Sequence, residues 1–134
     1  MNIPAEKLIP HRPPMRFIEA LTDCTVATAR GTACFSFDHF AVANGLVLES
    51  ALVECVAQTA AAWLGYRASC EDKPPAVGML AAVTDFQFYA AAHNDAQLII
   101  EVRELKHLGP MRLVSGSITC KGQRIAEGEL TIYA

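Results

Sequence analysis

The chain has 134 residues, which is enough for one domain with one sizeable hydrophobic core. Its hydrophobic fraction of 52% is high and its charged fraction of 19% is low, so we expect a homo-oligomer or an apolar ligand to cover extra surface. With a net charge of −3 and scattered Lys and Arg, the sequence predicts no basic surface that would bind nucleic acid.

The cysteines and the first residues indicate a cytoplasmic location. The cysteines are odd in number and irregularly spaced, without a C-x-x-C pair, which is typical of reduced thiols; they are Cys24, Cys34, Cys55, Cys70 and Cys120. Residues 1–14 mix prolines with charges instead of forming the apolar run of a signal peptide. We therefore expect a protein that is not exported.

The N-terminal third predicts a short helical turn and then β structure. Residues 5–9 resemble one helical turn, and a Pro-rich extended entry follows up to residue 16. Residues 24–37 are short apolar or Thr residues around a glycine, with alternation from Ala33 to Phe37. This pattern predicts a β-hairpin or one long bent strand.

Residues 46–65 predict a long helix, with Asn44 as its N-cap and Gly65 as its stop. Apolar residues occur all the way round this helix, so we expect it to be surrounded by protein or lipid. Glu54 near the middle, with Gln58 and Glu49, argues against a membrane span. The helix is therefore expected inside a protein core.

The remaining chain predicts a polar loop at 69–75 and then four strands. These strands cover residues 76–89, 97–105, 112–120 and 124–133, with turns at Gly109-Pro110 and Lys121-Gly122. There is no internal repeat or linker, so residues 1–134 are expected to form a single α+β domain. Its antiparallel β-sheet should curve around the long helix.

Glu54 and Gln58 are the residues that suggest chemistry. They lie one helical turn apart and project from the same face of an otherwise apolar helix. Burial favours a protonated carboxyl, which is the state that a general acid needs, and Gln58 could orient it through a hydrogen bond. The alternative is a structural Glu54, bonded to the sheet backbone or exposed at a dimer interface.

The spacing of the histidines and cysteines gives weaker evidence for further catalytic or metal-binding residues. His39 precedes the helix in a loop that could fold over the helix N-terminus, whereas His11, His93 and His107 lie in entry, loop or strand-edge positions. No His or Cys pair has metal-ligand spacing, so no metal site is expected. Cys55 adjoins Glu54 but is expected to act as a small buried hydrophobe.

An oxyanion hole can be proposed from backbone groups. Gly78, expected in the strand that begins at residue 76, has no side chain to block a substrate carbonyl from its amide. Amides of residues 48–50 at the helix N-terminus could supply a second donor. Glu49 fits the helix dipole there, either as a solvated first-turn carboxylate or beside the substrate.

Two motifs resemble a known family. The segment IPHRPPM at 9–15 is similar to the Pro-His-Arg signature of the 3-hydroxyacyl-acyl-carrier-protein dehydratases of fatty-acid synthesis. The segment ECVAQ at 54–58 is similar to their helix motif Glu-x-x-Ala-Gln. The resemblance extends over nearly the whole chain and implies a hotdog fold, the name for such a curved sheet around a central helix.

The resemblance also implies a reaction. In the family, a histidine removes the α-proton and the helix acid, reached across a dimer interface, protonates the departing 3-hydroxyl. Carried over, Glu54 is the acid, and His39 would be a displaced base. From the residues themselves we expect Gln58, Gly78, Phe40 and Glu49 to contact the substrate. The substrate is an acyl thioester on phosphopantetheine, from acyl carrier protein or coenzyme A, and no cofactor of the protein's own is implied.

The histidine loop departs from the family pattern. At the family's spacing from the acid the histidine would stand at position 40, where this chain has Phe40, and His39 lies one place earlier. The loop residues 41–45, AVANG, replace the usual Pro and Gly. This loop and the stretch AQTAAAW at 57–63 look closer to the dehydratase-like proteins of aryl-polyene pigment clusters, which occur beside a second hotdog dehydratase.

Three functions remain open. The first is a dehydratase of a 3-hydroxyacyl thioester, working as a homodimer, as a higher homo-oligomer or as a heterodimer with a second hotdog dehydratase. The second is a hotdog thioesterase, in which Glu54 activates water. The third is a non-catalytic subunit that completes a partner's site.

Overall fold

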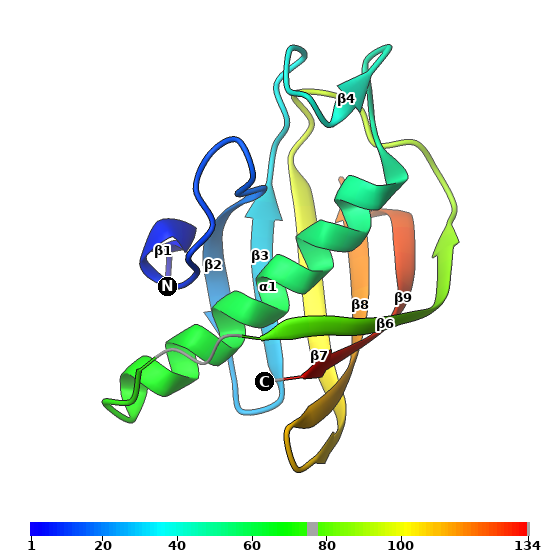
Figure 1. Cartoon of the computed structure of the whole chain (residues 1–134). Coiled ribbons are helices and arrows are strands. Elements are labelled where there is room, and N and C mark those ends of the chain that lie inside the picture. Colours follow the sequence, from blue (N-terminus) through cyan, green and yellow to red (C-terminus); the bar gives the residue numbers. More distant parts are fainter. Residues whose placement is uncertain (75–77, 134) are drawn as a thin grey trace.

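The protein is an antiparallel sheet curved around one long helix (Figure 1). The computed structural model describes residues 1–74 and 78–133. The helix α1 spans Glu49–Cys70, and the short 3₁₀ turn η1 spans Ala5–Lys7. The strands are β1 (Ile3–Pro4), β2 (Ile18–Cys24), β3 (Thr28–Ala33), β4 (Val42–Ala43), β5 (Leu46–Val47), β6 (Met79–Phe88), β7 (Leu98–Leu108), β8 (Met111–Cys120) and β9 (Gln123–Tyr133).

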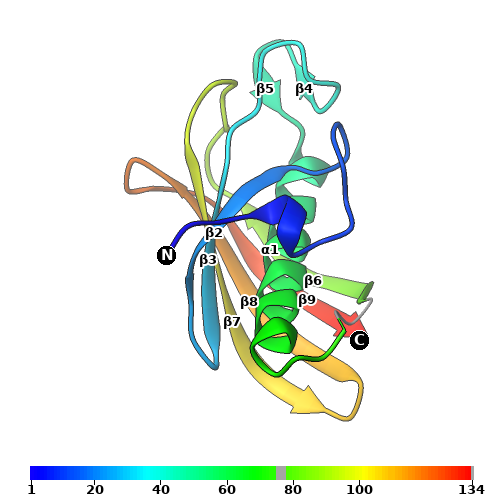
Figure 2. The same ribbon diagram turned by 90° about the vertical axis from the view of Figure 1, so that its left-hand side faces the viewer.

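The large sheet has the order β1-β2-β3-β7-β8-β9-β6, and each neighbouring pair is antiparallel. Figure 2 shows α1 on one side of this sheet, with the N-terminal segment beside it. The strand that follows α1, β6, lies at the edge of the sheet. The predicted α+β class and hotdog architecture are confirmed.

The β structure predicted for residues 24–37 is only partly correct: a hairpin is present, but its first strand, β2, runs from Ile18 to Cys24 and its second, β3, ends at Ala33, so residues 34–37 are not in a strand. Ile18 and Leu21 are buried in the core, at 1% and 0% exposure. Because this strand does not alternate strictly between buried and exposed positions, period-two alternation could not locate its start.

The prediction of Asn44 as the helix N-cap is wrong. Asn44 and Gly45 form the turn between β4 and β5, with φ angles of 54° and 77°. An Asn-Gly pair between two short extended segments is the preferred sequence for a two-residue hairpin turn, because both positions need positive φ. The helix therefore starts later, after Leu48, whose backbone is extended.

The prediction of Gly65 as the helix stop is also wrong, because α1 continues to Cys70. A Cβ atom at Gly65 would lie 2.4 Å from the carbonyl oxygen of Leu8, so this glycine lets the N-terminal segment pack on the helix. A Cβ atom at Gly116 of β8 would likewise lie 2.2 Å from the Cγ1 of Val56. Both glycines serve close packing of α1, which sequence spacing does not reveal.

The later strands follow the prediction closely. The strands predicted at 97–105, 112–120 and 124–133 correspond to β7, β8 and β9, except that β7 begins one residue later and extends to Leu108; the turns at Gly109-Pro110 and Lys121-Gly122 join them. The strand expected at 76–89 is β6, although residues 76 and 77 of that prediction lie outside the described residues. In residues 1–74 and 78–133, no helix is long and apolar enough to cross a membrane.

Gly65→Ala tests the close approach of the N-terminal segment to α1. Alanine is the better helix former, yet its methyl group would displace the backbone of Leu8, so we expect the free energy of unfolding to fall by about 1–3 kcal/mol in urea titrations. Ser50→Ala, at an exposed helix position, should stay within about 0.5 kcal/mol. A Gly65→Ala protein as stable as the original would contradict this packing.

Candidate active site

One face of α1 carries Glu54 and remains open along its length. Glu54, Ala57, Ala61 and Leu64 are spaced at three or four residues, so they share this face. They line a cavity of about 220 Å³. The other lining residues are His11, Gln58, Gly78, Leu80 and Ile132. A carboxylate therefore stands at a small cavity whose walls are largely apolar.

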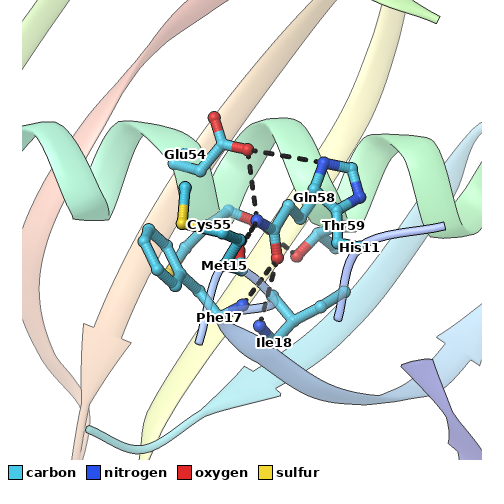
Figure 3. Close-up of polar contacts among 8 residues, drawn as sticks. All are labelled: His11, Met15, Phe17, Ile18, Glu54, Cys55, Gln58 and Thr59. Atoms are coloured by element: carbon cyan, nitrogen blue, oxygen red, sulfur yellow. Dashed lines mark hydrogen bonds and ion pairs between the residues drawn. The ribbon is translucent and has the colours of Figure 1, made fainter. Parts of the chain in front are cut away.

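Gln58 is the centre of the polar contacts below Glu54 (Figure 3). Its side chain is 1% exposed. Its Oε1 accepts the backbone N–H groups of Phe17 at 2.8 Å and Ile18 at 3.4 Å. Its Nε2 donates to the carbonyl of Met15 at 2.8 Å and to the Oε1 of Glu54 at 3.1 Å. The predicted orienting contact between Gln58 and Glu54 is present in this geometry.

His11 joins the cavity, a position that sequence reasoning did not give it. Its Nε2 lies 3.8 Å from the Oε1 of Glu54, and its buried Nδ1 has no hydrogen-bond partner among the described residues. Arg12 holds the same segment by donating to the carbonyls of Ile9 and His11. The Pro-His-Arg motif at 10–12 was the signal that could have pointed to this contact.

Glu54 is less buried than the sequence predicted. Its side chain is 38% exposed, whereas Cys55 and Val56 beside it are 0% exposed. The apolar pattern all round the helix arises because the small residues Ala57 and Ala61 lie on the open face. In the single chain, the expected desolvation of Glu54 is therefore incomplete, and a second molecule would be needed to cover it.

His39 lies in an aromatic cluster. Its ring stacks on Phe40 at 4.7 Å between centroids and meets Phe17 and Phe35 edge-on. Its Nδ1 accepts the N–H of Ala41 at 3.0 Å, and its Nε2 lies 3.1 Å from the carbonyl oxygen of Pro14.

Because a carbonyl only accepts, these two contacts assign the neutral form of His39 with its proton on Nε2. Both ring nitrogens are then engaged, so no lone pair is free for a substrate proton. His39 is also absent from the lining of the Glu54 cavity. Its role as general base stays a prediction, which requires that at least one of the two hydrogen bonds be broken.

The other predicted substrate contacts are spread over the chain. Gly78 lines the Glu54 cavity, but it precedes β6 instead of lying within a strand. Phe40 is 57% exposed beside His39, and Glu49 is exposed in the first turn of α1. Neither lines the cavity, and residues 48–50 do not line it either. The chain thus brings Glu54, Gln58 and Gly78 together and leaves Phe40 and Glu49 apart.

Cys55 lies within the core of the fold. Burial, with a smaller effect of the neighbouring Glu54, raises the pKa of its thiol far above the ordinary value, so it stays protonated and unreactive. Its position matches the expected small hydrophobe. Among the residues that the structure describes, no group of three His, Cys, Asp or Glu side chains is placed to hold a metal ion.

The antiparallel sheet curved around a central helix defines a hotdog-fold protein, and this helix places a carboxylate beside a small cavity. The chain belongs to the ApeP-like family, whose model, described as ApeP dehydratase, matches residues 3–134. The resemblance inferred from the two motifs is thereby confirmed, and the protein is a member of a dehydratase family. No curated protein matches the chain.

Solved structures agree on the fold. The dehydratase heterocomplex ApeI:P from Xenorhabdus doucetiae contains a chain with a TM-score of 0.89 at 22% identity, over 98% of this chain and 90% of that one. An uncharacterised protein from Pyrococcus horikoshii has a TM-score of 0.73 at 15% identity, over 98% of this chain and 93% of that one. A hypothetical thioesterase with coenzyme A from Streptococcus pneumoniae has a TM-score of 0.67 at 11% identity, over 84% of this chain and 82% of that one.

Replacement of Gln58 by methionine tests the hydrogen-bond centre. Methionine fills a similar volume but leaves the N–H of Phe17 and the carbonyl of Met15 without their partner. Because these two backbone groups are only partly buried, we expect a total loss of about 1–3 kcal/mol in the free energy of unfolding. Glu49→Gln is the control at an exposed helix position, and an equally small effect of both changes would refute the role of Gln58.

Proposed function

We propose that this protein is a subunit of a 3-hydroxyacyl thioester dehydratase, in which Glu54 acts as the general acid. The observation that carries this proposal is the cavity in which Glu54, held by Gln58, faces apolar side chains and the backbone of Gly78. A thioester carbonyl near Gly78 could accept its amide N–H, and an acyl chain would contact the apolar wall. Membership of a dehydratase family supports this reading of the site over hydrolysis.

The elimination requires an acid and a base on the substrate. A base removes the α-proton, the bond between C3 and the hydroxyl oxygen breaks, and the proton of Glu54 leaves with that oxygen as water. The product is a trans-2-enoyl thioester. Because Gln58 donates to the Oε1 of Glu54, the transferable proton would sit on the other carboxyl oxygen. The proton taken by the base returns to Glu54 before the next cycle.

The surface around the cavity supports action within an oligomer. β6 is an edge strand, and its exposed residues include Met79, Leu80 and Val83, at 69%, 42% and 47% exposure. Leu80 also lines the Glu54 cavity. A partner that pairs with β6 would therefore cover both unpaired backbone groups and the open side of the cavity. Such a partner would complete the burial that a protonated Glu54 needs.

The most suitable partner is a second hotdog dehydratase subunit. The similar structure from Xenorhabdus doucetiae is a dehydratase heterocomplex. Both ring nitrogens of His39 are bonded in this chain, so the base would be supplied by a histidine of the partner across the interface. In a homodimer, the second copy would offer only a His39 whose two ring nitrogens are bonded in the same way, so it would not supply a free base. We also propose that this protein and its partner are located in the cytoplasm.

Glu54→Gln in the assembled dehydratase tests the acid. We expect dehydration of a carrier-bound 3-hydroxyacyl chain, followed by enoyl absorbance, to fall by roughly 100- to 10,000-fold, because the amide cannot donate the proton. Glu6→Gln, which alters an exposed carboxylate that does not line the Glu54 cavity, is the control and should leave turnover unchanged. Unaltered turnover in Glu54→Gln would exclude the acid role, and release of free thiol without enoyl absorbance would favour a thioesterase.

His39→Gln tests the source of the base. The glutamine amide can replace both hydrogen bonds, to Ala41 and Pro14, but it cannot take up a proton. If the partner supplies the base, turnover of the complex should change by less than about tenfold. A loss as large as that of Glu54→Gln, at an unchanged melting temperature, would instead assign the base to His39.

A further inference from the structure

A second cavity of about 240 Å³ lies at the C-terminal end of α1 and carries an excess of positive charge. We call it the basic cavity; it is lined by Arg67, Lys73 and Arg112, together with Leu64, Ala68, Glu71 and Pro74. Three cationic side chains thus face one lining carboxylate. An anion is the ligand that such a cavity would attract.

The charge in excess belongs to Arg67. Lys73 pairs with Glu71 at 3.1 Å, and Arg112 pairs with Glu104 at 2.7 Å. The Nη1 of Arg67 is buried and has no hydrogen-bond partner within the described part of the chain. A buried donor without a partner costs free energy, and more so when it is charged. Because this Nη1 is closed to solvent, an anion in the basic cavity would have to bond the other N–H groups of Arg67, which lines the cavity.

Arg67 is held in place by aromatic packing. Its guanidinium lies over the ring of Trp63 at 5.1 Å, and the guanidinium of Arg112 lies 5.9 Å from the same ring. Trp63 itself is 1% exposed and donates to the carbonyl of Thr25. Glu104, 2.7 Å from Arg112, offsets part of the repulsion between the two guanidinium groups. An anion in the basic cavity would offset the charge of Arg67 in the same way.

The basic cavity adjoins the Glu54 cavity. Leu64 lines both of them on the helix side. On the sheet side, Ile132 of the Glu54 cavity pairs in register with Arg112 of the basic cavity. Arg67 follows Glu54 by more than three turns of α1, a separation of about 20 Å along the helix axis. An extended pantetheine arm spans a distance of this order between its thioester and its phosphate.

We propose that Arg67, with Arg112 and Lys73, binds the phosphate of the phosphopantetheine arm whose thioester lies at Glu54. The inference rests on the proposed function, because it supplies the anchor for that same substrate. A guanidinium suits this task, since its planar N–H groups can bond two phosphate oxygens at once. The phosphate of a carrier protein's arm and that of coenzyme A share this chemistry.

Calorimetric titration of the full chain, alone and with its dehydratase partner, tests the proposal. The probes are 4′-phosphopantetheine and pantetheine, which differ only in the phosphate. We expect 4′-phosphopantetheine to bind more tightly, and Arg67→Met to weaken it by roughly ten- to a hundredfold, as for a lost charge-assisted hydrogen bond. Pantetheine should bind equally to both proteins. Equal affinity of the unchanged protein for the two probes would overturn the proposal without recourse to any variant.

Matched variants separate charge from packing. Methionine keeps an apolar stem over Trp63, and Arg67→Lys keeps the charge but should recover only part of the affinity. Arg30→Met, which removes an exposed arginine paired with Glu101, should leave the affinity for 4′-phosphopantetheine unchanged. If Arg30→Met weakens binding as much as Arg67→Met does, the loss of affinity comes from the change in net charge, and a specific site at Arg67 is refuted.

Two further comparisons identify the source of the phosphate and isolate the inference. If the carrier protein is the source, Arg67→Met should raise the KM for a carrier-bound substrate more than for the coenzyme A thioester, and the reverse order would assign coenzyme A. Glu54→Gln should retain the preference for 4′-phosphopantetheine while losing dehydration. Phosphate-dependent binding without any dehydration by the unchanged complex would overturn the proposed function alone. If the rate of dehydration is the same in Arg67→Met as in the unchanged complex, the phosphate site is overturned and the proposed function is not.

Discussion

Gln58 connects the helix to the segment that leads into the sheet, and the geometry of the site depends on this connection. Its amide bonds backbone groups of Met15, Phe17 and Ile18, which belong to the entry and the first residues of β2. The remaining donor goes to Glu54. Close apolar packing already restricts the position of α1. The directional bonds of Gln58, whose side chain is 1% exposed, further fix the register of the helix against the entry segment. The carboxylate is therefore positioned by the same side chain that anchors the entry segment.

The open face of α1 gives the fold its functional asymmetry. Most of the helix is enclosed by the sheet, with Gly116 and Gly65 allowing close contact on two sides. The face with Glu54 is bordered instead by β6, an edge strand whose side chains are largely exposed. In the single chain the carboxyl of Glu54 is 38% exposed, so it is still in contact with solvent. Association at β6 would bury the acid and enclose the substrate in one step.

The two cavities suggest how one helix could organise a long substrate. Glu54 stands in the second turn of α1 and Arg67 in its last turn, so the reacting carbon and the phosphate would be held by one rigid element. Rigid positioning of this kind lowers the entropy lost in reaching the transition state. The aromatic packing of His39 and Trp63 keeps the neighbouring segments fixed around this axis. Binding of the arm and elimination of water would then be functions of the same helix.

The sequence alone determined the long helix with Glu54 and Gln58, the antiparallel strands after it and the dehydratase family, because these follow from local periodicity and from short motifs. It also contained the Asn44-Gly45 turn signal, which competed with an N-cap interpretation. Tertiary structure alone decided the roles of Gly65 and His11, since Leu8 and Glu54, their respective neighbours, are distant in sequence. It also decided that His39 bonds to Pro14 and that the Nη1 of Arg67 has no hydrogen-bond partner among the described residues, because hydrogen-bond satisfaction depends on which segments the fold brings together.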